Sequence, residues 1–112
     1  MKLVTAVIKP HMVEAVTDAL HAIDVQGITI TEARGHGRQR GHTEVYRGSE
    51  YKVDFVPKVE IKVITHDAEA EKVANTIVEA ARTGKIGDGK LWIQPIEMAV
   101  RIRTGEIGDD AI

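Results

Sequence analysis

The chain has 112 residues, which allows one domain with a single hydrophobic core and leaves little room for a deep catalytic cleft. Its 15 basic and 17 acidic side chains give a net charge of -2. This excludes a general attraction to nucleic acid or anionic lipid, so any anion site must be a local cluster. The sequence has no cysteine, which excludes disulfides and thiolate metal sites.

No membrane-spanning helix is expected, because no apolar run approaches the roughly 20 residues that a helix needs to cross a bilayer. Any membrane contact should therefore go through a partner. Met1 leads directly into a strand-like run without a signal peptide. We therefore expect the protein to be cytoplasmic.

The first part of the chain predicts a strand, a helix and a second strand. Residues 2–9 are β-branched and apolar on both faces, as in a central strand. Pro10 stops that strand and suits the first turn of a helix, which Gly27 is expected to end. Residues 28–31 alternate apolar with polar side chains and predict the second strand. The helix is supported by an apolar stripe at spacings of three and four, namely Met12, Val13, Val16, Leu20 and Ile23.

Residues 35–54 form a long polar segment between two apolar runs. Four glycines release its backbone, and seven titratable or basic side chains between His36 and Arg47 leave too few apolar residues to bury. A loop this long inside a compact domain is usually functional or disordered. A tolerated hairpin insertion explains the composition equally well, because long surface loops cost little extra closure entropy. The sequence thus predicts an exposed arm.

After the arm, a strand and a second helix are expected. Residues 55–56 and 59–64 predict a strand with one covered face. Asp67 is the expected N-cap of the helix, and Gly84 is expected to close it. The apolar stripe of this helix consists of Ala70, Val73, Ala74, Ile77, Val78 and Ala81.

The last predicted strand covers residues 91–100, in which Pro95 favours an edge position or a bulge. The tail from Arg101 is polar and is expected to be mobile. The element order is two βαβ units in tandem, which is the α+β, ferredoxin-like βαββαβ arrangement in one domain.

Both helices of such a fold cover one face of the sheet and leave the other face exposed. We expect the strands to supply apolar side chains to both faces, so the exposed face should pack against copies of the same chain. A homo-oligomer is therefore expected. The side chains behind this inference are Val4, Ala6, Ile8, Ile28, Ile30, Val59, Ile61 and Val63.

The turn at residues 83–90, reading T-G-K-I-G-D-G-K, is a candidate anion site. Its three glycines let backbone amides approach an anion, and Lys90 adds a positive charge. It is not a P-loop, because Leu91 stands where a hydroxyl is required and a strand follows in place of a helix. A helix C-cap followed by a tight turn explains the same residues at least as well.

Arg101 and Arg103 are expected on the same side of an extended segment. Paired arginines so spaced can grip a polyphosphate with bidentate hydrogen bonds. A solvated strand end is the default explanation for two lone basic residues. Both interpretations stay open at this point.

The sequence gives weak support for catalysis or a histidine metal site. No Ser-His-Asp order, paired-carboxylate spacing or nucleophile elbow stands out. Trp92, the single tryptophan, is expected to pack in the core or against another subunit and not to stack on a ligand. The five histidines lack the spacing of a helical ligand pair and are expected at the surface: His11, His21, His36, His42 and His66.

Two stretches resemble the signatures of the PII nitrogen-regulatory signalling proteins. Residues 46–51 (Y-R-G-S-E-Y) match the family's tyrosine-modification signature, and residues 83–93 resemble its second signature, with Trp92 where phenylalanine is usual. The resemblance covers essentially the whole chain. His36 and Arg40 stand where phenylalanine and lysine are frequent in the family, which affects the fine tuning of effector affinity.

The resemblance implies a homotrimer of ferredoxin-like subunits that binds ATP or ADP in the clefts between subunits. In family terms, the arm at about 37–55 is the T-loop, the turn at about 83–90 is the B-loop, and about 101–112 is the C-terminal loop. The residues implied on one side of the nucleotide are Gly87, Asp88, Gly89 and Lys90, with Arg101 and Arg103 on its phosphates across the cleft and Arg38 from the arm. The base and ribose region is implied to be lined by Thr29, Gly35, Gly37, Val63 and Ile64.

A second effector, 2-oxoglutarate, is also implied. With magnesium and ATP bound, Gln39 would complete the metal shell, and 2-oxoglutarate would bridge the metal and the arm beside Gly87. Its distal carboxylate would meet Lys58. A hard cation takes oxygen ligands and phosphates, and a dianion needs a cationic partner, so these residue types suit the roles.

The implied function is a non-enzymatic sensor whose arm changes conformation with the bound effector and is read by partner proteins. The implied partners are an ammonium transporter, a nucleotidylyltransferase acting on this protein or on glutamine synthetase, or an arginine-pathway kinase. Tyr51 is the implied site of uridylylation or adenylylation, and an unmodified arm used only for docking is the alternative.

Two other classes compete with this interpretation. A small nucleotide-hydrolysing enzyme would need a base near the glycine-rich turn, and no residue there is obviously placed for it. A purely structural ferredoxin-like oligomer would leave Gln39, Lys90 and the two arginines unexplained.

Overall fold

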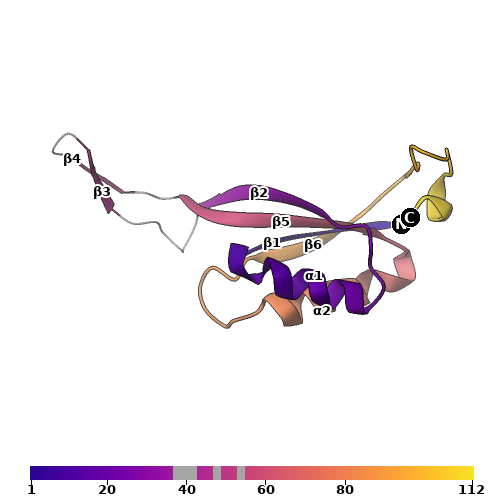
Figure 1. Ribbon diagram of the computed structural model, residues 1–112, viewed down its shortest axis with the longest axis horizontal. Coiled ribbons are helices and arrows are strands. Elements are labelled where there is room, and N and C mark those ends of the chain that lie inside the picture. Colours follow the sequence, from indigo (N-terminus) through magenta and orange to yellow (C-terminus); the bar gives the residue numbers. More distant parts are fainter. Residues whose placement is uncertain (37–42, 47–48, 53–54) are drawn as a thin grey trace.

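The computed structural model describes residues 1–36, 43–46, 49–52 and 55–112. In these residues a four-stranded antiparallel sheet has the strand order β2-β5-β1-β6. Two helices, α1 (Val13–Ala22) and α2 (Ala70–Ala81), lie against one face of this sheet (Figure 1). The predicted α+β ferredoxin-like fold is therefore confirmed. The strands are β1 (Lys2–Ile8), β2 (Thr29–His36), β5 (Phe55–Thr65) and β6 (Lys90–Pro95).

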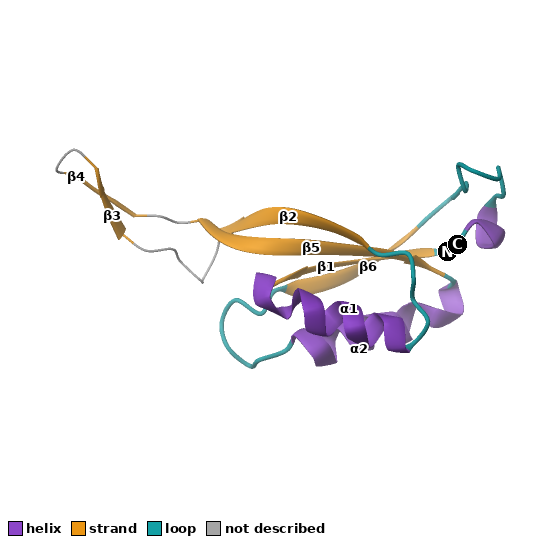
Figure 2. Cartoon of the chain, in the orientation of Figure 1, coloured by secondary structure: helices purple, strands orange, loops and turns teal. Residues whose placement is uncertain are grey.

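The remaining elements are short. Within the arm, β3 (Thr43–Tyr46) and β4 (Ser49–Lys52) pair as a separate antiparallel sheet, beyond the point where β2 and β5 project from the body (Figure 2). Single 3-10 turns precede α1 and α2 and follow the last strand, namely η1 (Pro10–Met12), η2 (Asp67–Glu69) and η3 (Gly108–Ala111). In the described part of the chain, no helix is both long enough and apolar enough to cross a bilayer.

The first helix ends earlier than predicted. Asp24 adopts a left-handed backbone conformation with φ of 66°, and the N–H of Val25 donates to the carbonyl of Leu20 at 3.0 Å. This is the reversal that glycine usually provides at a helix C-terminus. The prediction that Gly27 ends the helix is therefore wrong, because an aspartate adopts the same conformation three residues earlier.

The predicted N-cap at Asp67 is also wrong. A 3-10 turn begins at this residue, and α2 starts only at Ala70. The Asp67 carboxylate instead accepts a 2.7 Å hydrogen bond from the amino group of Met1. The carboxylate thus binds the chain's N-terminus, a tertiary contact, and does not cap the helix.

β6 ends at Pro95 and not at residue 100. It is an edge strand, as the proline predicted, and its last residue pairs with Lys2.

Cross-strand register decides which side chains are buried. Val4 lies opposite Val63 and Ile93, and directly opposite residues share a face of the sheet. Ile30, opposite Ile61, also faces the helices but remains 48% exposed at the edge. The core under the helices contains Val4, Ala6, Ile8, Val16, Leu20, Val59, Ile61, Val63, Val73, Ala74, Ile77 and Ala81.

The expectation that the predicted apolar strand residues serve both faces is therefore wrong, because their alternation places them all on the helix side. The open face carries other side chains. Trp92, Thr5, Lys62 and Thr29 form one row across it, and Gln94, Leu3 and Ile64 form the next. It thus mixes polar groups with apolar side chains that one chain leaves uncovered: Trp92 is 40% and Ile64 42% exposed.

Candidate functional site

One carboxylate holds together the loop that joins α2 to β6. Asp88 Oδ2 accepts hydrogen bonds from the backbone N–H groups of Thr83 and Gly84, both at 2.8 Å. Asp88 Oδ1 accepts a bond from the Thr83 hydroxyl at 2.5 Å. An ionised aspartate suits this role because it offers two acceptor oxygens on a short stem. The Asp88 side chain therefore serves the loop itself.

Lys9, the residue after β1, ties this loop to the sheet. Its Nζ lies 3.0 Å from Asp88 Oδ1 and 3.1 Å from Thr83 Oγ1. The lysine side chain is only 12% exposed, so this contact is more shielded than an ordinary surface ion pair. Bonds from the Thr83 hydroxyl and backbone, joined by one from Lys9, hold the pKa of the Asp88 carboxyl well below its usual range. Asp88 is thus ionised at neutral pH.

Gly89 lies directly against β1. Its φ is 98°, and a Cβ at this position would stand 1.7 Å from the carbonyl oxygen of Val7. A Cβ is essentially never found closer than 3.0 Å to another heavy atom. Glycine is therefore required here by packing alone, before any ligand is considered.

Lys58 lies on the open face near the arm end of β5 and is only 9% exposed. Its Nζ donates to the carbonyl of Gly87 at 2.5 Å. A Cβ on Gly35 would lie 3.1 Å from Lys58 Cγ, so the bare glycine makes room for the lysine stem. Desolvation, and after it the charge of Lys9, lowers the pKa of the Lys58 ammonium, while Asp88 opposes the shift. Gly35, Lys58 and Gly87, all predicted site residues, thus meet in one place.

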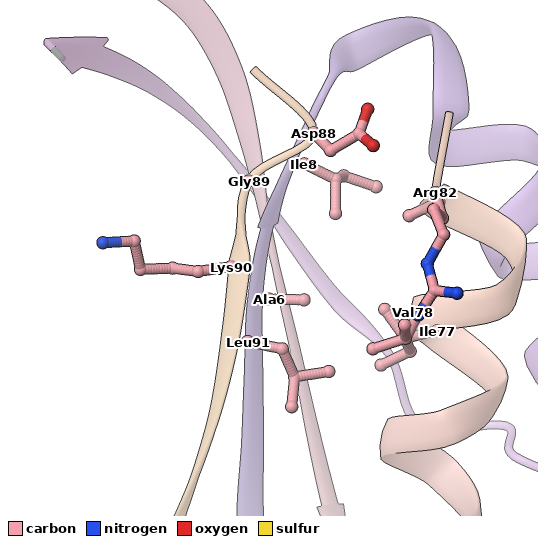
Figure 3. Close-up of a pocket in the computed structure, with 10 residues that line it drawn as sticks. Ala6, Ile8, Ile77, Val78, Arg82, Asp88, Gly89, Lys90 and Leu91 are labelled. Atoms are coloured by element: carbon pink, nitrogen blue, oxygen red, sulfur yellow. The ribbon is translucent and has the colours of Figure 1, made fainter. Parts of the chain in front are cut away.

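A hollow of about 160 Å³ lies on the helix side of the loop, between α2 and the strands β1 and β6 (Figure 3). Its floor is apolar, with Ile8, Ile77 and Leu91 among its lining residues. The side chain of Lys90 points away from it (Figure 3). Small-molecule pockets usually measure about 300 to 1,000 Å³, so this hollow is too small for a nucleotide. The charged side chain of Lys90 therefore lies on the side of the loop that faces away from this hollow.

The two predicted arginines lie beyond the opposite end of β6. The backbone N–H of Arg101 donates to the carbonyl of Glu106, and the N–H of Gly105 donates to the carbonyl of Arg101, both at 2.8 Å. Residues 101–104 therefore turn, and the prediction of an extended segment is wrong because this local pairing closes a loop. Arg101 Nη1 lies 3.3 Å from Glu106 Oε1. The tail expected to be mobile from Arg101 is folded, and it includes a bridge between Val100 and Ile107.

Thr29 and Ile64 belong to the same half of the molecule as the arginines. Thr29 opens β2, and Ile64 lies opposite Leu3 near the end of β5. Each lies six residues from a predicted partner on the same strand, Gly35 or Lys58, which corresponds to about 20 Å along a strand.

The predicted site residues thus fall into two groups. We call Gly35, Lys58 and the residues Gly87, Asp88, Gly89 and Lys90 the arm-end group. We call Thr29, Ile64, Arg101 and Arg103 the far-end group. In β2 and β5, arm-end residues lie at one end of the strand and far-end residues at the other. Arm-end residues also lie at the start of β6, and the two arginines lie beyond its other end. The C-terminal segment is therefore on the opposite side of the molecule from the arm (Figure 1). Charge-assisted hydrogen bonds span only about 2.7 to 2.9 Å, so a single chain does not bring both groups onto the same phosphates.

Comparison with known proteins places this arrangement in a family. The family model for nitrogen regulatory protein P-II matches residues 1–106. The chain belongs to the P-II family. It is 57% identical to a nitrogen regulatory protein P-II of Rhodospirillum rubrum, 55% to one of Azospirillum brasilense and 52% to one of Haemophilus influenzae. Each alignment spans 112 residues and covers 100% of both chains.

Several residues implied by the P-II resemblance lie outside the described residues. Gly37, Arg38 and Gln39 are among them, so their roles stay predictions. Tyr51 lies in β4, where its backbone pairs opposite Glu44.

The two departures from the P-II pattern that the structure describes have clear neighbours. The ring of His36 lies 5.5 Å from that of Phe55, centroid to centroid, and the Arg34 guanidinium lies 5.4 Å from the same Phe55 ring. Trp92 Nε1 donates to Gln94 Oε1 at 3.2 Å on the open face. Trp92 is therefore not a core residue of the single chain, and its predicted packing against another subunit stays a prediction.

Sequence reasoning missed Lys9 and the hydroxyl of Thr83. Lys9 is 79 positions from Asp88 in sequence, and no local pattern links the end of a first strand to a loop before the last one. The signal that was present is the βαββαβ order itself, because it makes the first and last strands neighbours. The end of β1 and the start of β6 then lie side by side at the same end of the sheet.

Proposed function

We propose that the chain is a non-enzymatic sensor that binds ATP or ADP in clefts between the subunits of a homotrimer, and that it reports nitrogen, carbon and energy status in the cytoplasm. Membership of the P-II family supports the regulatory role. The observation that carries the proposal is the separation of the arm-end and far-end groups. Both supply cations for the same phosphates, so the arm end of one copy must meet the far end of the next.

Such a head-to-tail contact uses two different surfaces, and it closes into a ring when the rotation fits. The open sheet faces would then turn inward and cover Trp92 and Ile64, which are about two-fifths exposed in one chain. Each junction of the ring makes one cleft.

The described residues suit the proposed ligands in charge. In the arm-end group, Lys90 and the backbone of Gly87 to Gly89 face the nucleotide, while the Asp88 side chain stays within its loop. Lys58 supplies the cation that the distal carboxylate of 2-oxoglutarate needs. Gln39 would complete the shell of a magnesium ion held by ATP, and the ion would join the two effectors.

Subunit mixing tests the shared cleft. One variant carries Lys90→Gln at the arm end, and the other carries Arg103→Ala at the far end. Each alone should bind ATP weakly, but refolding them together should recover part of the binding, because one junction in each mixed trimer unites two intact ends. Titration calorimetry measures the recovery. Mixed trimers that bind no better than either parent would rule out a site between subunits.

The second effector is tested by titrating 2-oxoglutarate with and without Mg-ATP. Binding should be detectable only with Mg-ATP, and Gln39→Ala should abolish it while leaving ATP binding in place, because coupling between two ligands is reciprocal. Equal binding to nucleotide-free protein would contradict this order of assembly.

The arm is the proposed output, docking on a nitrogen-metabolism partner such as an ammonium transporter, a nucleotidylyltransferase or an arginine-pathway kinase. Nucleotidylylation of Tyr51 would add charge and bulk to the arm and block such docking. Mass spectra of protein isolated from nitrogen-starved and nitrogen-replete cells should show the modification on the Tyr51 peptide in one state. An equal load in Tyr51→Phe would place the modification elsewhere.

A further inference from the structure

Lys9, Thr83 and Asp88 form a cluster at the base of the glycine-rich loop, which we call the loop lock. Asp88 accepts from both the backbone and the hydroxyl of Thr83, and Lys9 contacts both side chains at 3.0 and 3.1 Å. All of these contacts join protein groups to one another. They join the end of β1 to the loop between α2 and β6, which is more than 70 positions away in sequence.

The lock lies one peptide bond from the contact that holds Lys58. The carbonyl of Gly87, which accepts the Lys58 ammonium at 2.5 Å, belongs to the residue before Asp88. On the other side of Asp88, Gly89 is pressed against Val7 of β1. A loop gripped on both sides has little freedom to shift, so the bonds of Asp88 determine where the Gly87 carbonyl points.

Charge adds a second link between the lock and Lys58. Asp88 and Lys9 both act electrostatically on Lys58, in opposite directions. Lys9, Asp88 and Lys58 together carry one positive charge, because Lys9 offsets the aspartate. Without Lys9, Asp88 would be an unbalanced carboxylate facing the cation that an incoming anion needs.

We propose that Lys9 is a positioning residue for anion binding: through Asp88 and Thr83 it fixes the Gly87 carbonyl, and with it the Lys58 ammonium, in the place where a dicarboxylate ligand is bound. This inference rests on the proposed function, in which Lys58 meets the distal carboxylate of 2-oxoglutarate. It adds a residue, the one that follows β1, that makes no contact with the ligand.

Two measurements on the whole protein test the proposal. The first is hydrogen exchange, in the ligand-free protein, of the Thr83 and Gly84 amides, which donate hydrogen bonds to Asp88. The second is titration of 2-oxoglutarate in the presence of Mg-ATP. Lys9→Gln removes the charge, Lys9→Arg keeps it, and Lys85→Gln makes the same change of charge at an exposed position of the same loop.

We expect Lys9→Gln to speed exchange of both amides and to weaken 2-oxoglutarate binding by about tenfold, the effect of losing one charge-assisted hydrogen bond. Lys9→Arg should recover most of the binding, and Lys85→Gln should stay within about twofold of the wild type. Asp88→Asn raises the local charge by one but opens the lock, so it should also bind more weakly.

If Asp88→Asn bound 2-oxoglutarate more tightly than the wild type, local charge alone would explain the effect of Lys9, and the positioning role of the loop lock would be wrong. Wild-type exchange and wild-type affinity in Lys9→Gln would overturn this inference alone. A wild-type protein that does not bind 2-oxoglutarate with Mg-ATP would instead overturn the proposed function, and the positioning role would fall with it.

Discussion

The two ends of the sheet hold their loops in different ways. At the arm end, the loop before β6 is fastened by side chains from other elements, Lys9 and Lys58. At the far end, the loop after Val100 closes mainly on its own backbone, through the pair formed by Arg101 and Glu106. A loop fastened from outside keeps its shape only while the rest of the fold is intact, whereas a self-closed loop tolerates change around it. The glycines Gly89 and Gly105 show the contrast directly.

The largest expected effect comes from giving these two glycines the same methyl group. Both have a positive φ, but a Cβ on Gly89 would meet the Val7 carbonyl oxygen at 1.7 Å, while one on Gly105 meets no described atom within 4 Å. We expect Gly89→Ala to destabilise the protein by at least ~3 kcal/mol and Gly105→Ala by about 1 kcal/mol. Denaturant unfolding at equal protomer concentration measures both. Similar losses in the two variants would break the comparison.

The far end should matter for the ligand more than for the fold. Arg101→Ala and Arg103→Ala should each weaken ATP binding by about tenfold to a hundredfold, because a charge-assisted hydrogen bond is worth about 1.5 to 3 kcal/mol. The subunit assembly should stay intact, which sedimentation can verify. Arg82→Ala is the matched control, since Arg82 borders the hollow on the helix side (Figure 3). Unchanged ATP affinity in both far-end variants would show that these arginines do not bind the nucleotide in the cleft.

A smaller effect is expected at Gly35. A Cβ there would lie 3.1 Å from Cγ of the Lys58 side chain, which is flexible and can shift by a few tenths of an ångström. Gly35→Ala should cost less than about 1 kcal/mol of stability, yet weaken 2-oxoglutarate binding roughly threefold by displacing the ammonium. Calorimetry and denaturant unfolding together separate the two effects. A large loss of stability would mean that the lysine stem cannot adjust.

The smallest effect concerns pH. The pKa of Asp88 is depressed in the folded protein below its ordinary value of 3.8, so its stabilising contribution is present above that value and is lost as pH falls through the folded pKa. Between pH 7 and about 4 the loop should therefore keep its amide protection. The chemical shift of the Asp88 carboxyl carbon, followed by NMR, should stay constant over this range. A transition near pH 4 or above would show that the Thr83 bonds do not form in solution.

Much of the fold follows from local patterns. The period-two and period-3.6 spacing of apolar residues predicted both helices and all four strands of the main sheet in their correct order. Pro95 predicted an edge position or a bulge for the last strand, and β6 has the edge position. These predictions succeed because each depends on residues within one turn or one pleat of each other. The glycine-rich turn was visible for the same reason. The predicted helix end at Gly84 is wrong, because α2 ends at Ala81 and its C-cap residue Arg82 is already extended.

Tertiary structure decided what local patterns could not. Register placed all the predicted apolar strand residues on one face, because a shift of one residue exchanges the two faces of a strand. Sheet topology placed Lys90 and Arg101 at opposite ends of the molecule, although they are eleven positions apart in sequence. It also joined Lys9 to Asp88, two residues whose contact exists only because β1 and β6 lie side by side. Side-chain partners of this kind depend on three-dimensional proximity, which the sequence of either segment does not record.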